Sequence, residues 1–255
     1  MGFLKSVYYT HLSPSKAERS HRYALELCNR GVATPESIGY ILRYDAWGLV
    51  RESYYVCRDV GRKACDLQAH ARAWASPEGF MEALADYLLS VHRAGVEHLD
   101  LSPGNILYEP QRVEGEEVYD FRLIDLNRMK LHDAPLSRRQ VLANLARLMN
   151  TRSVTRRLAY DYALAASWEP DSFVAELEKV CDTFWRKRWL KLSYRYAKRH
   201  LGVGAWTFLY QLCRYYFALM RGRKNEAERL YRRYLQREDI RHIERSKRGF
   251  SYRYE

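Results

Sequence analysis

Two segments in the first hundred residues carry apolar side chains at helical spacing, three or four positions apart. The first is residues 14–30, which Ser13 opens as an N-cap and Gly31 closes. The second is residues 77–94, which stops at a glycine. The packed side of the first segment is formed by Ala17, Ala24, Leu25 and Cys28. We therefore predict two helices, with Glu18 at the edge of the packed side of the first.

Strand-like runs lie between the two helices and after the second. Residues 37–44 and 49–60 are joined by a turn-like Asp-Ala-Trp-Gly connection, which predicts an antiparallel hairpin. Residues 105–108 and 119–124 flank a polar segment with a glycine and predict another hairpin. From about Pro135 the pattern is helical nearly to the end. This order, with strands and helices segregated, predicts an α+β fold.

The composition supports a packed core and limits the possible classes of protein. Of the 255 residues, 47% are hydrophobic and 29% are charged, which excludes disorder, collagen and a coiled coil. The five cysteines form no CxxC pair or Cys/His cluster, so neither a disulfide framework nor a structural zinc site is expected. Residues 1–5 lead into polar sequence without the apolar segment of a signal peptide. These features favour a reducing cytoplasm.

The most apolar window is residues 204–220. It contains a glutamine and an arginine and falls short of the ~20 apolar residues that a membrane-spanning helix needs. We therefore predict a buried helix in this window.

The net charge of +12 lies in the C-terminal part of the chain. Residues 181–255 hold 20 Lys and Arg against 7 Asp and Glu, whereas the remainder holds 23 against 24. Basic clusters interleaved with Trp and Tyr favour contact with an anionic membrane surface. A helical lobe with a solvated cationic exterior is the structural alternative. Nucleic acid is a third interpretation, but the segment has no recognised nucleic-acid motif.

Two polar clusters, residues 98–105 and 123–128, carry the candidate chemistry. Phosphoryl transfer needs a carboxylate that orients the attacking hydroxyl and two oxygen ligands for magnesium. Asp100, Asn105 and Asp125 supply these groups. A single Asp or Asn in a loop is more often a turn former. The His-x-Asp-x-x-x-x-Asn spacing after a helix, with an Asp at the end of the next hairpin, matches a protein-kinase-like fold.

These motifs resemble the bacterial lipopolysaccharide core kinase family, which includes Kdo and heptose kinases. The resemblance is most specific in HLDLSPGNIL at 98–107 and in IDLNR at 124–128, where protein kinases carry Asp-Phe-Gly. The helix start SKAER at 15–19 and a Thr-Pro pair at 34–35 are also similar, and the resemblance spans roughly residues 10–165. It implies a kinase-like fold, ATP with Mg²⁺ as the donor, and a sugar hydroxyl of the lipopolysaccharide inner core as the acceptor.

The resemblance also implies a role for each matching residue. Asp100 would be the catalytic base, and Asn105 and Asp125 would be the metal ligands. Glu18 would be the helix carboxylate that pairs with an ATP-gripping lysine, although the helix dipole also favours an acidic residue in a first turn. A hinge at Tyr55 to Val60 would contact adenine, with the cofactor-binding positions Cys57, Arg58, Asp59 and Val60.

The sequence departs from the family pattern before the first predicted helix. A kinase N-lobe begins with strands that carry a Gly-rich loop and a lysine, but only 13 residues precede Pro14. Lys5 and Lys16 lack the context of such a strand, so we assign no ATP-gripping lysine. A start codon further upstream, a degenerate kinase and a substitute lysine are the three explanations.

The sequence as a whole predicts an α+β, protein-kinase-like fold with a reduced N-lobe at 1–60 and a mostly helical C-lobe at 61–255. The predicted activity is ATP-dependent phosphotransfer to an inner-core sugar, in the cytoplasm and peripheral at the inner face of the inner membrane. One alternative keeps the enzyme and replaces the acceptor by a protein or a small-molecule alcohol. The other is a pseudokinase that acts as a scaffold.

Overall fold

The structure is a computed structural model that describes residues 2–61, 65–66, 79–113, 116–148, 152–235, 243–246 and 249–252. Its internal contacts divide the chain into two compact units. The first comprises residues 1–149 and 153–177, and the second comprises 150–152 and 178–255. The predicted boundary between lobes at residue 60 lies inside the first unit and stays a prediction.

Helix α2 (Lys16–Asn29) corresponds to the helix predicted at 14–30, with a different N-cap. The Ser15 hydroxyl accepts a hydrogen bond from Glu18 N–H at 3.1 Å, and Glu18 Oε2 accepts one from Ser15 N–H at 3.4 Å. This reciprocal pair is a capping box, which satisfies two backbone donors at once. The predicted N-cap at Ser13 is therefore wrong, because the capping box places the start two residues later.

The packed side of α2 also differs from the prediction. Its buried residues are Ala17, Ser20, Ala24 and Leu27. Leu25 and Cys28, which we expected on the packed side, are exposed. The buried face is therefore rotated toward Ser20, a polar residue that an apolar pattern does not reveal.

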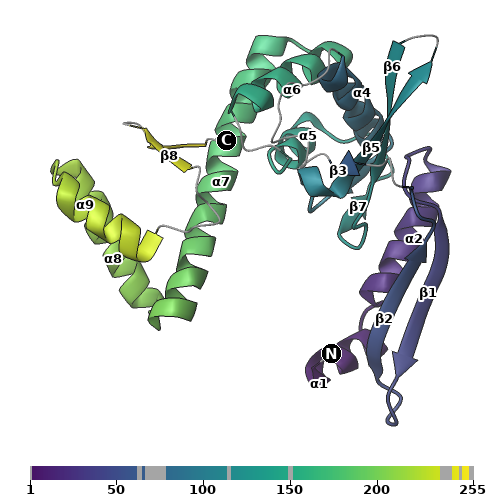
Figure 1. Ribbon diagram of the computed structural model, residues 1–255, viewed down its shortest axis with the longest axis horizontal. Coiled ribbons are helices and arrows are strands. Elements are labelled where there is room, and N and C mark those ends of the chain that lie inside the picture. The colour runs from purple at the N-terminus through teal and green to yellow at the C-terminus, as the bar shows by residue number, and fades with distance from the viewer. Residues whose placement is uncertain are drawn as a thin grey trace. The chain divides into compact units, whose positions relative to one another are not determined.

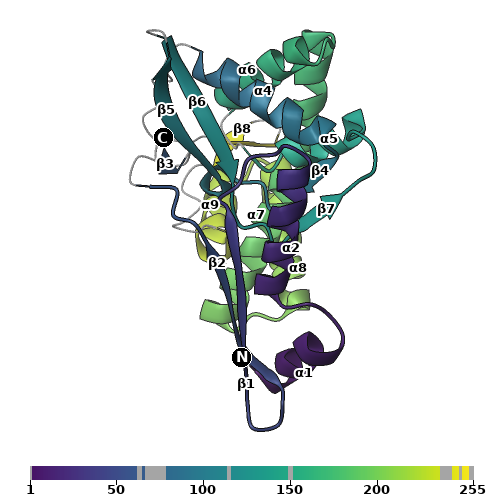
Figure 2. The same cartoon turned by 90° about the vertical axis from the view of Figure 1, so that its right-hand side faces the viewer.

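The first predicted hairpin is confirmed as β1 (Ser37–Tyr44) and β2 (Val50–Cys57), which pair antiparallel. Strand β2 ends before the predicted limit at residue 60. Helix α2 lies along this hairpin (Figures 1 and 2), and the ring of its His21 is 5.6 Å from that of Tyr40. A helix that the sequence pattern did not predict, α1 (Phe3–His11), precedes α2, and its Thr10 hydroxyl accepts from Val50 N–H at 2.9 Å.

The second predicted hairpin is confirmed as β5 (Ile106–Val113) and β6 (Glu116–Leu123), with Tyr108 opposite Phe121. Strand β3 (Cys65–Asp66) pairs with β5. Helix α4 (Phe80–Arg93) fits the helix predicted at 77–94, whose first two residues lie outside the described residues. The Phe80 ring packs 5.0 Å from the Tyr108 ring, edge to face, so α4 covers the hairpin.

Two short strands that were not predicted, β4 (Val96–His98) and β7 (Met129–Leu131), pair antiparallel. Gly95 leads into β4 with φ +72°, and a Cβ there would lie 2.4 Å from the His132 carbonyl oxygen. Only glycine fits that position without movement of the backbone. The 3-10 turn η1 (Pro103–Asn105) follows β4 and precedes β5.

Helices α5 (Arg138–Leu145) and α6 (Arg152–Ala165) and the first part of α7 (Pro170–Leu201) complete the first unit. Their core contains Tyr162 and Phe173, whose rings stack at 5.7 Å. The predicted change to helices after Pro135 is confirmed.

The second unit contains the rest of α7, α8 (Ala205–Met220), α9 (Lys224–Leu230) and the single turn η2 (Tyr231–Leu235). A hairpin of β8 (Ile243–Ser246) and β9 (Gly249–Tyr252) follows, which differs from the helical end that we predicted. The core of this unit consists of Trp189, Ala197, Phe208, Tyr215, Ala218, Ala227, Leu230 and Leu235.

The prediction that the helix at 204–220 is buried is wrong for one face of α8, which is exposed. Trp206 and Met220 are 84% and 79% exposed, because apolar side chains occupy opposite faces of the helix and only one face packs. No helix in the described ranges is long and apolar enough to cross a membrane.

Candidate active site

His98, the last residue of β4, connects the two candidate motifs. Its fully buried ring donates from Nε2 to the Ile124 carbonyl at 3.0 Å, and its Nδ1 accepts from Asp100 N–H at 3.2 Å. These partners require the neutral tautomer with the proton on Nε2. Burial lowers the pKa of His98, which favours the same neutral form. The ring thus holds residues 98–105 against residues 123–128.

Asp100 presents an accessible carboxylate at the turn after β4. Its side chain is 42% exposed, and its Oδ2 lies 3.1 Å from Nη1 of Arg128. Leu99 N–H also donates to the Arg128 carbonyl at 2.9 Å. Backbone and side chain of Arg128 therefore both hold the segment that carries Asp100.

The amide of Asn105 is oriented by the backbone of the same loop. Its Nδ2 donates to the Asp100 carbonyl at 2.8 Å, and the Asn105 carbonyl accepts from Ile124 N–H at 3.0 Å. Since Nδ2 is used by the loop, the side-chain oxygen Oδ1 is the end of the amide that remains as a ligand.

Asp125 follows the end of β6 in a left-handed backbone conformation, with φ 55°. Such a conformation costs energy for any residue with a Cβ and is concentrated at functional sites. The side chain is exposed, and its Oδ1 accepts a hydrogen bond from Nδ2 of Asn127. The turn thus presents a carboxylate to solvent beside the segment that His98 fixes.

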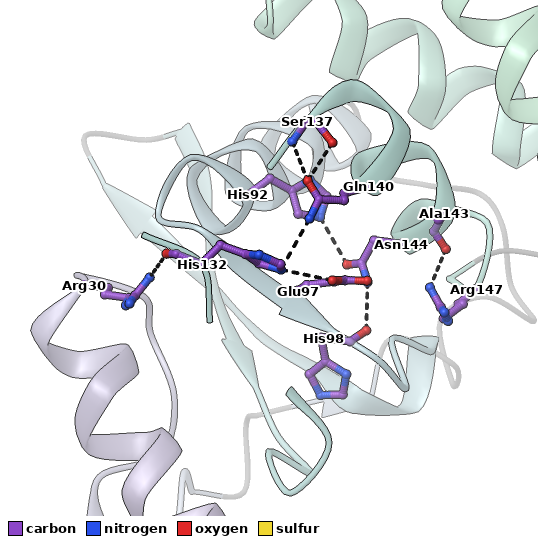
Figure 3. A network of polar contacts seen from close by, with 10 residues as sticks. All are labelled: Arg30, His92, Glu97, His98, His132, Ser137, Gln140, Ala143, Asn144 and Arg147. Atoms are coloured by element: carbon purple, nitrogen blue, oxygen red, sulfur yellow. Dashed lines mark hydrogen bonds and ion pairs between the residues drawn. The ribbon is translucent and has the colours of Figure 1, made fainter. Parts of the chain in front are cut away.

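A buried polar chain supports the catalytic loop from the helical side (Figure 3). Asn144 of α5 donates from Nδ2 to the His98 carbonyl at 2.8 Å, and its Oδ1 accepts from Nε2 of His92 at 3.2 Å. The Tyr162 hydroxyl donates to Nδ1 of His92 at 2.9 Å. Burial lowers the pKa of His92 to about 4, so the ring is neutral at pH 7. The amide of Asn144 and both ring nitrogens of His92 have partners in this series of hydrogen bonds, so the bonds hold these side chains rigidly.

A second set of polar contacts involves Glu97 of β4 and the residues around it. The Glu97 carboxylate is 3.1 Å from Nε2 of His132. Arg30, at the end of α2, donates from Nη1 to the carbonyls of Ala94 and His132 at 2.9 and 2.7 Å. Figure 3 shows Arg30 beside His132, and the His132 ring beside the Glu97 carboxylate. The C-terminal end of α2 is thereby fixed to the residues just before β4 and just after β7.

The other predicted nucleotide-binding positions lie on α2 and after β2. Glu18 takes part in the capping box described above. Cys57 ends β2, and Arg58 N–H donates to the Glu36 carbonyl at 2.8 Å while its guanidinium pairs with the Glu36 carboxylate at 3.1 Å. Asp59 Oδ1 accepts from Gly61 N–H at 3.1 Å. Roles for Glu18 and for 57–60 with Val60 in nucleotide binding stay predictions.

The two lysines considered from sequence do not lie on strands. Lys5 lies on α1, and Lys16 is the first residue of α2. Strands β1 and β2 contain no lysine.

The donor atoms of the site suit a hard cation. Asn105 Oδ1 and the Asp125 carboxylate are oxygen donors, the type that Mg²⁺ prefers. No group of three or more His, Cys, Asp or Glu that could hold a metal occurs within the residues described. Mg²⁺ in phosphoryl-transfer sites is held by one or two protein oxygens together with substrate phosphates and water, so the residues present fit it.

Sequence reasoning gave no role to Arg128, His92 or Asn144. Arg128 belongs to the IDLNR motif itself, which is the one signal that pointed to it. His92 and Asn144 lie on helices with ordinary apolar patterns, and only the fold brings them to the catalytic loop.

The model of the lipopolysaccharide kinase (Kdo/WaaP) family matches residues 2–163, a range that includes all the site residues above. A solved structure, "WaaP in complex with acyl carrier protein", is 23% identical and has a TM-score of 0.48. The match covers 65% of this chain and 76% of that chain. No curated protein matches the sequence.

Proposed function

Because this chain belongs to the lipopolysaccharide kinase (Kdo/WaaP) family, we propose that it transfers the γ-phosphate of ATP to a sugar hydroxyl of the lipopolysaccharide inner core. Family membership and the order of elements confirm the predicted α+β, protein-kinase-like class and identify a kinase. The observation that carries the finer proposal is the hydrogen-bonded connection of the loop with Asp100 and Asn105 to the segment with Asp125.

Asp100 is the proposed catalytic base. A carboxylate in this position orients the acceptor hydroxyl and takes up its proton as the phosphoryl group is transferred. Partial exposure allows an acceptor to approach Asp100, while Arg128 restricts the rotation of the carboxylate. The fixed backbone from His98 to Asn105 then holds the base at a constant place relative to the phosphates.

Asn105 and Asp125 are the proposed ligands of Mg²⁺. When bound, the cation neutralises charge between the β- and γ-phosphates of ATP. The Asn105 amide is pre-oriented by its bond to the Asp100 carbonyl, and the Asp125 carboxylate is turned outward by its left-handed backbone. Pre-orientation lowers the cost of ordering these ligands when the nucleotide binds.

The adenine would lie against the segment after β2. Arg58 N–H is already used by the Glu36 carbonyl, so the purine would contact neighbouring backbone groups of residues 57–60. With no lysine on β1 or β2, we expect weak ATP binding, because the phosphates lose a cation that kinases supply from a strand. The proposed location is the cytoplasm, at the inner face of the inner membrane, where a lipid-linked acceptor is presented.

Calorimetry of ATP binding with and without Mg²⁺ tests the nucleotide site first. We expect Mg²⁺-dependent binding that Asp125→Ala abolishes and that Asp133→Ala, an exposed aspartate in the loop after β7, leaves unchanged. Transfer of labelled phosphate to purified inner-core lipopolysaccharide then tests the acceptor. Asp100→Asn should abolish transfer and retain ATP binding. Binding without transfer to the core sugar would reject this acceptor, and absence of ATP binding would reject the kinase site.

A further inference from the structure

Helix α8 of the second unit has two opposite apolar faces. One face packs into the core of the unit through Phe208, Tyr215 and Ala218. At 3.6 residues per turn, six exposed apolar residues fall on a stripe about 100° wide on the other side of the helix. This exposed stripe consists of Trp206, Leu209, Tyr210, Cys213, Phe217 and Met220.

The stripe is continuous and uncharged. The one ionisable basic side chain of α8, Arg214, lies outside it and is 2.9 Å from Glu226 of α9. Single exposed apolar residues are common, but a contiguous row along a whole helix marks a surface that contacts a partner or a lipid. The helix has 16 residues, and none of the described helices could span a bilayer, so contact with lipid would be parallel to the surface.

Cations lie at the edge of the exposed stripe. The Arg221 guanidinium is 4.3 Å from the centre of the Phe217 ring, and that of Arg214 is 6.0 Å from the Tyr210 ring. Arg223 and Lys224, just beyond Met220, are also exposed. Basic and aromatic side chains at the border of an apolar helix face are typical of helices that lie in the interface of an anionic membrane.

The charge of the second unit identifies the kind of partner. Residues 181–255 carry 20 basic and 7 acidic residues, so two copies of this unit would repel each other. A nucleic acid would match the charge but leave the apolar stripe without a contact, because most such contacts are to phosphate. An anionic lipid surface satisfies both observations, since its headgroups pair with the cations and its acyl boundary receives the aromatic side chains.

We infer that α8 is a membrane-docking helix, with the exposed stripe from Trp206 to Met220 inserted in the interfacial layer of an anionic bilayer and Arg221, Arg223 and Lys224 at its phosphates. The inference is independent of the phosphotransfer chemistry, because every residue of the candidate active site lies in the first unit. Loss of vesicle binding with intact ATP binding therefore separates the two proposals.

Co-sedimentation of the full chain with vesicles tests the inference. Vesicles of phosphatidylcholine with about one-third phosphatidylglycerol should bind the protein, and pure phosphatidylcholine should bind it at least about tenfold more weakly. The double variant Trp206→Ser, Met220→Ser should weaken binding to the anionic vesicles by about tenfold or more, since each lost side chain removes apolar area from the interface. Both side chains are exposed, so circular dichroism and Tm should be unchanged.

Trp47→Ser is the matched control. Trp47 is 87% exposed at the turn of the β1–β2 hairpin in the first unit and should have no effect on vesicle binding. Equal loss in the control and the double variant would overturn the inference, as would equal binding of wild type and double variant. Sedimentation equilibrium tests whether a second copy of the chain binds the stripe instead. A concentration-dependent dimer that is lost in the double variant, together with no binding to vesicles, would assign the stripe to a second copy and overturn the inference.

Discussion

The guanidinium of Arg128 lies 3.1 Å from the carboxylate of Asp100, although 28 residues separate them in the chain. This ion pair joins the segment of the proposed metal ligand Asp125 to the proposed base. Together with the His98 ring bond to Ile124, it provides two side-chain links between the halves of the site. Arg128 can affect catalysis without contacting the substrate, because it fixes the direction of the Asp100 carboxylate, which is the proposed base.

Arg128→Ala should therefore lower kcat by about tenfold to a hundredfold with little effect on KM for ATP, because the base loses its orientation. Stability should change by less than about 1 kcal/mol, since both partners are partly exposed and such pairs contribute little. Arg128→Lys should restore part of the activity because it retains the charge. Steady-state kinetics and urea unfolding measure both effects.

Arg43→Ala is the control for this prediction. Arg43 forms a comparable exposed pair with Glu52, at 3.2 Å, in the first hairpin. Its loss should leave kcat unchanged. A kcat for Arg128→Ala equal to that of Arg43→Ala would show that the pair has no positioning role.

Local sequence signals predicted much of the fold, and contacts across the chain explain what they missed. The bounds of β1 and the catalytic spacing from Asp100 to Asn105 depend on neighbouring residues and could be predicted. The Arg128 pair and the buried partners of His98 depend on the tertiary fold. The exposed face of α8 was missed because hydrophobicity alone does not distinguish a buried face from an exposed one. The N-cap of α2 was misplaced because two serines close together both fit the pattern.

Asn144→Ala should destabilise the first unit by about 2–3 kcal/mol. The substitution leaves Nε2 of His92 without a partner in a buried region, and unsatisfied buried groups are costly. It also removes one of the two hydrogen bonds to the His98 carbonyl, which keeps the bond from Leu101 N–H at 3.2 Å. It should also reduce kcat, because the His98 carbonyl belongs to the strand that carries the catalytic loop. Asn29→Ala, at the exposed end of α2, should change stability by less than about 1 kcal/mol. Equal unfolding midpoints for the two variants would contradict a supporting role for the polar chain.

Gly95→Ala should be more destabilising than the same change at another glycine with positive φ. At Gly95 the new Cβ would collide with the His132 carbonyl, whereas at Gly48, with φ +71°, no atom lies within 4 Å. The left-handed backbone alone costs about 1 kcal/mol, and the collision adds a shift of the backbone between α4 and β4. We therefore expect about 1 kcal/mol for Gly48→Ala and about 3 kcal/mol or more for Gly95→Ala. Chemical unfolding of both variants measures the difference, and similar values would show that the contact relaxes freely.

The stability of the first unit should fall as the pH falls from neutral. In the folded protein burial lowers the pKa of His92 to about 4, whereas an unfolded histidine has a pKa of about 6.5. Below about pH 6.5 the unfolded chain therefore binds a proton that the folded chain does not, and the unfolded state gains up to about 3 kcal/mol by the time the pH reaches 4. Burial shifts the pKa of His98 in the same direction and adds to the effect. His92→Gln removes one of the two titrating groups, so its free energy of unfolding should depend less steeply on pH between about 7 and 5 than that of the wild type. Urea unfolding at a series of pH values tests this, and identical slopes for the two proteins would mean that His92 does not titrate on unfolding.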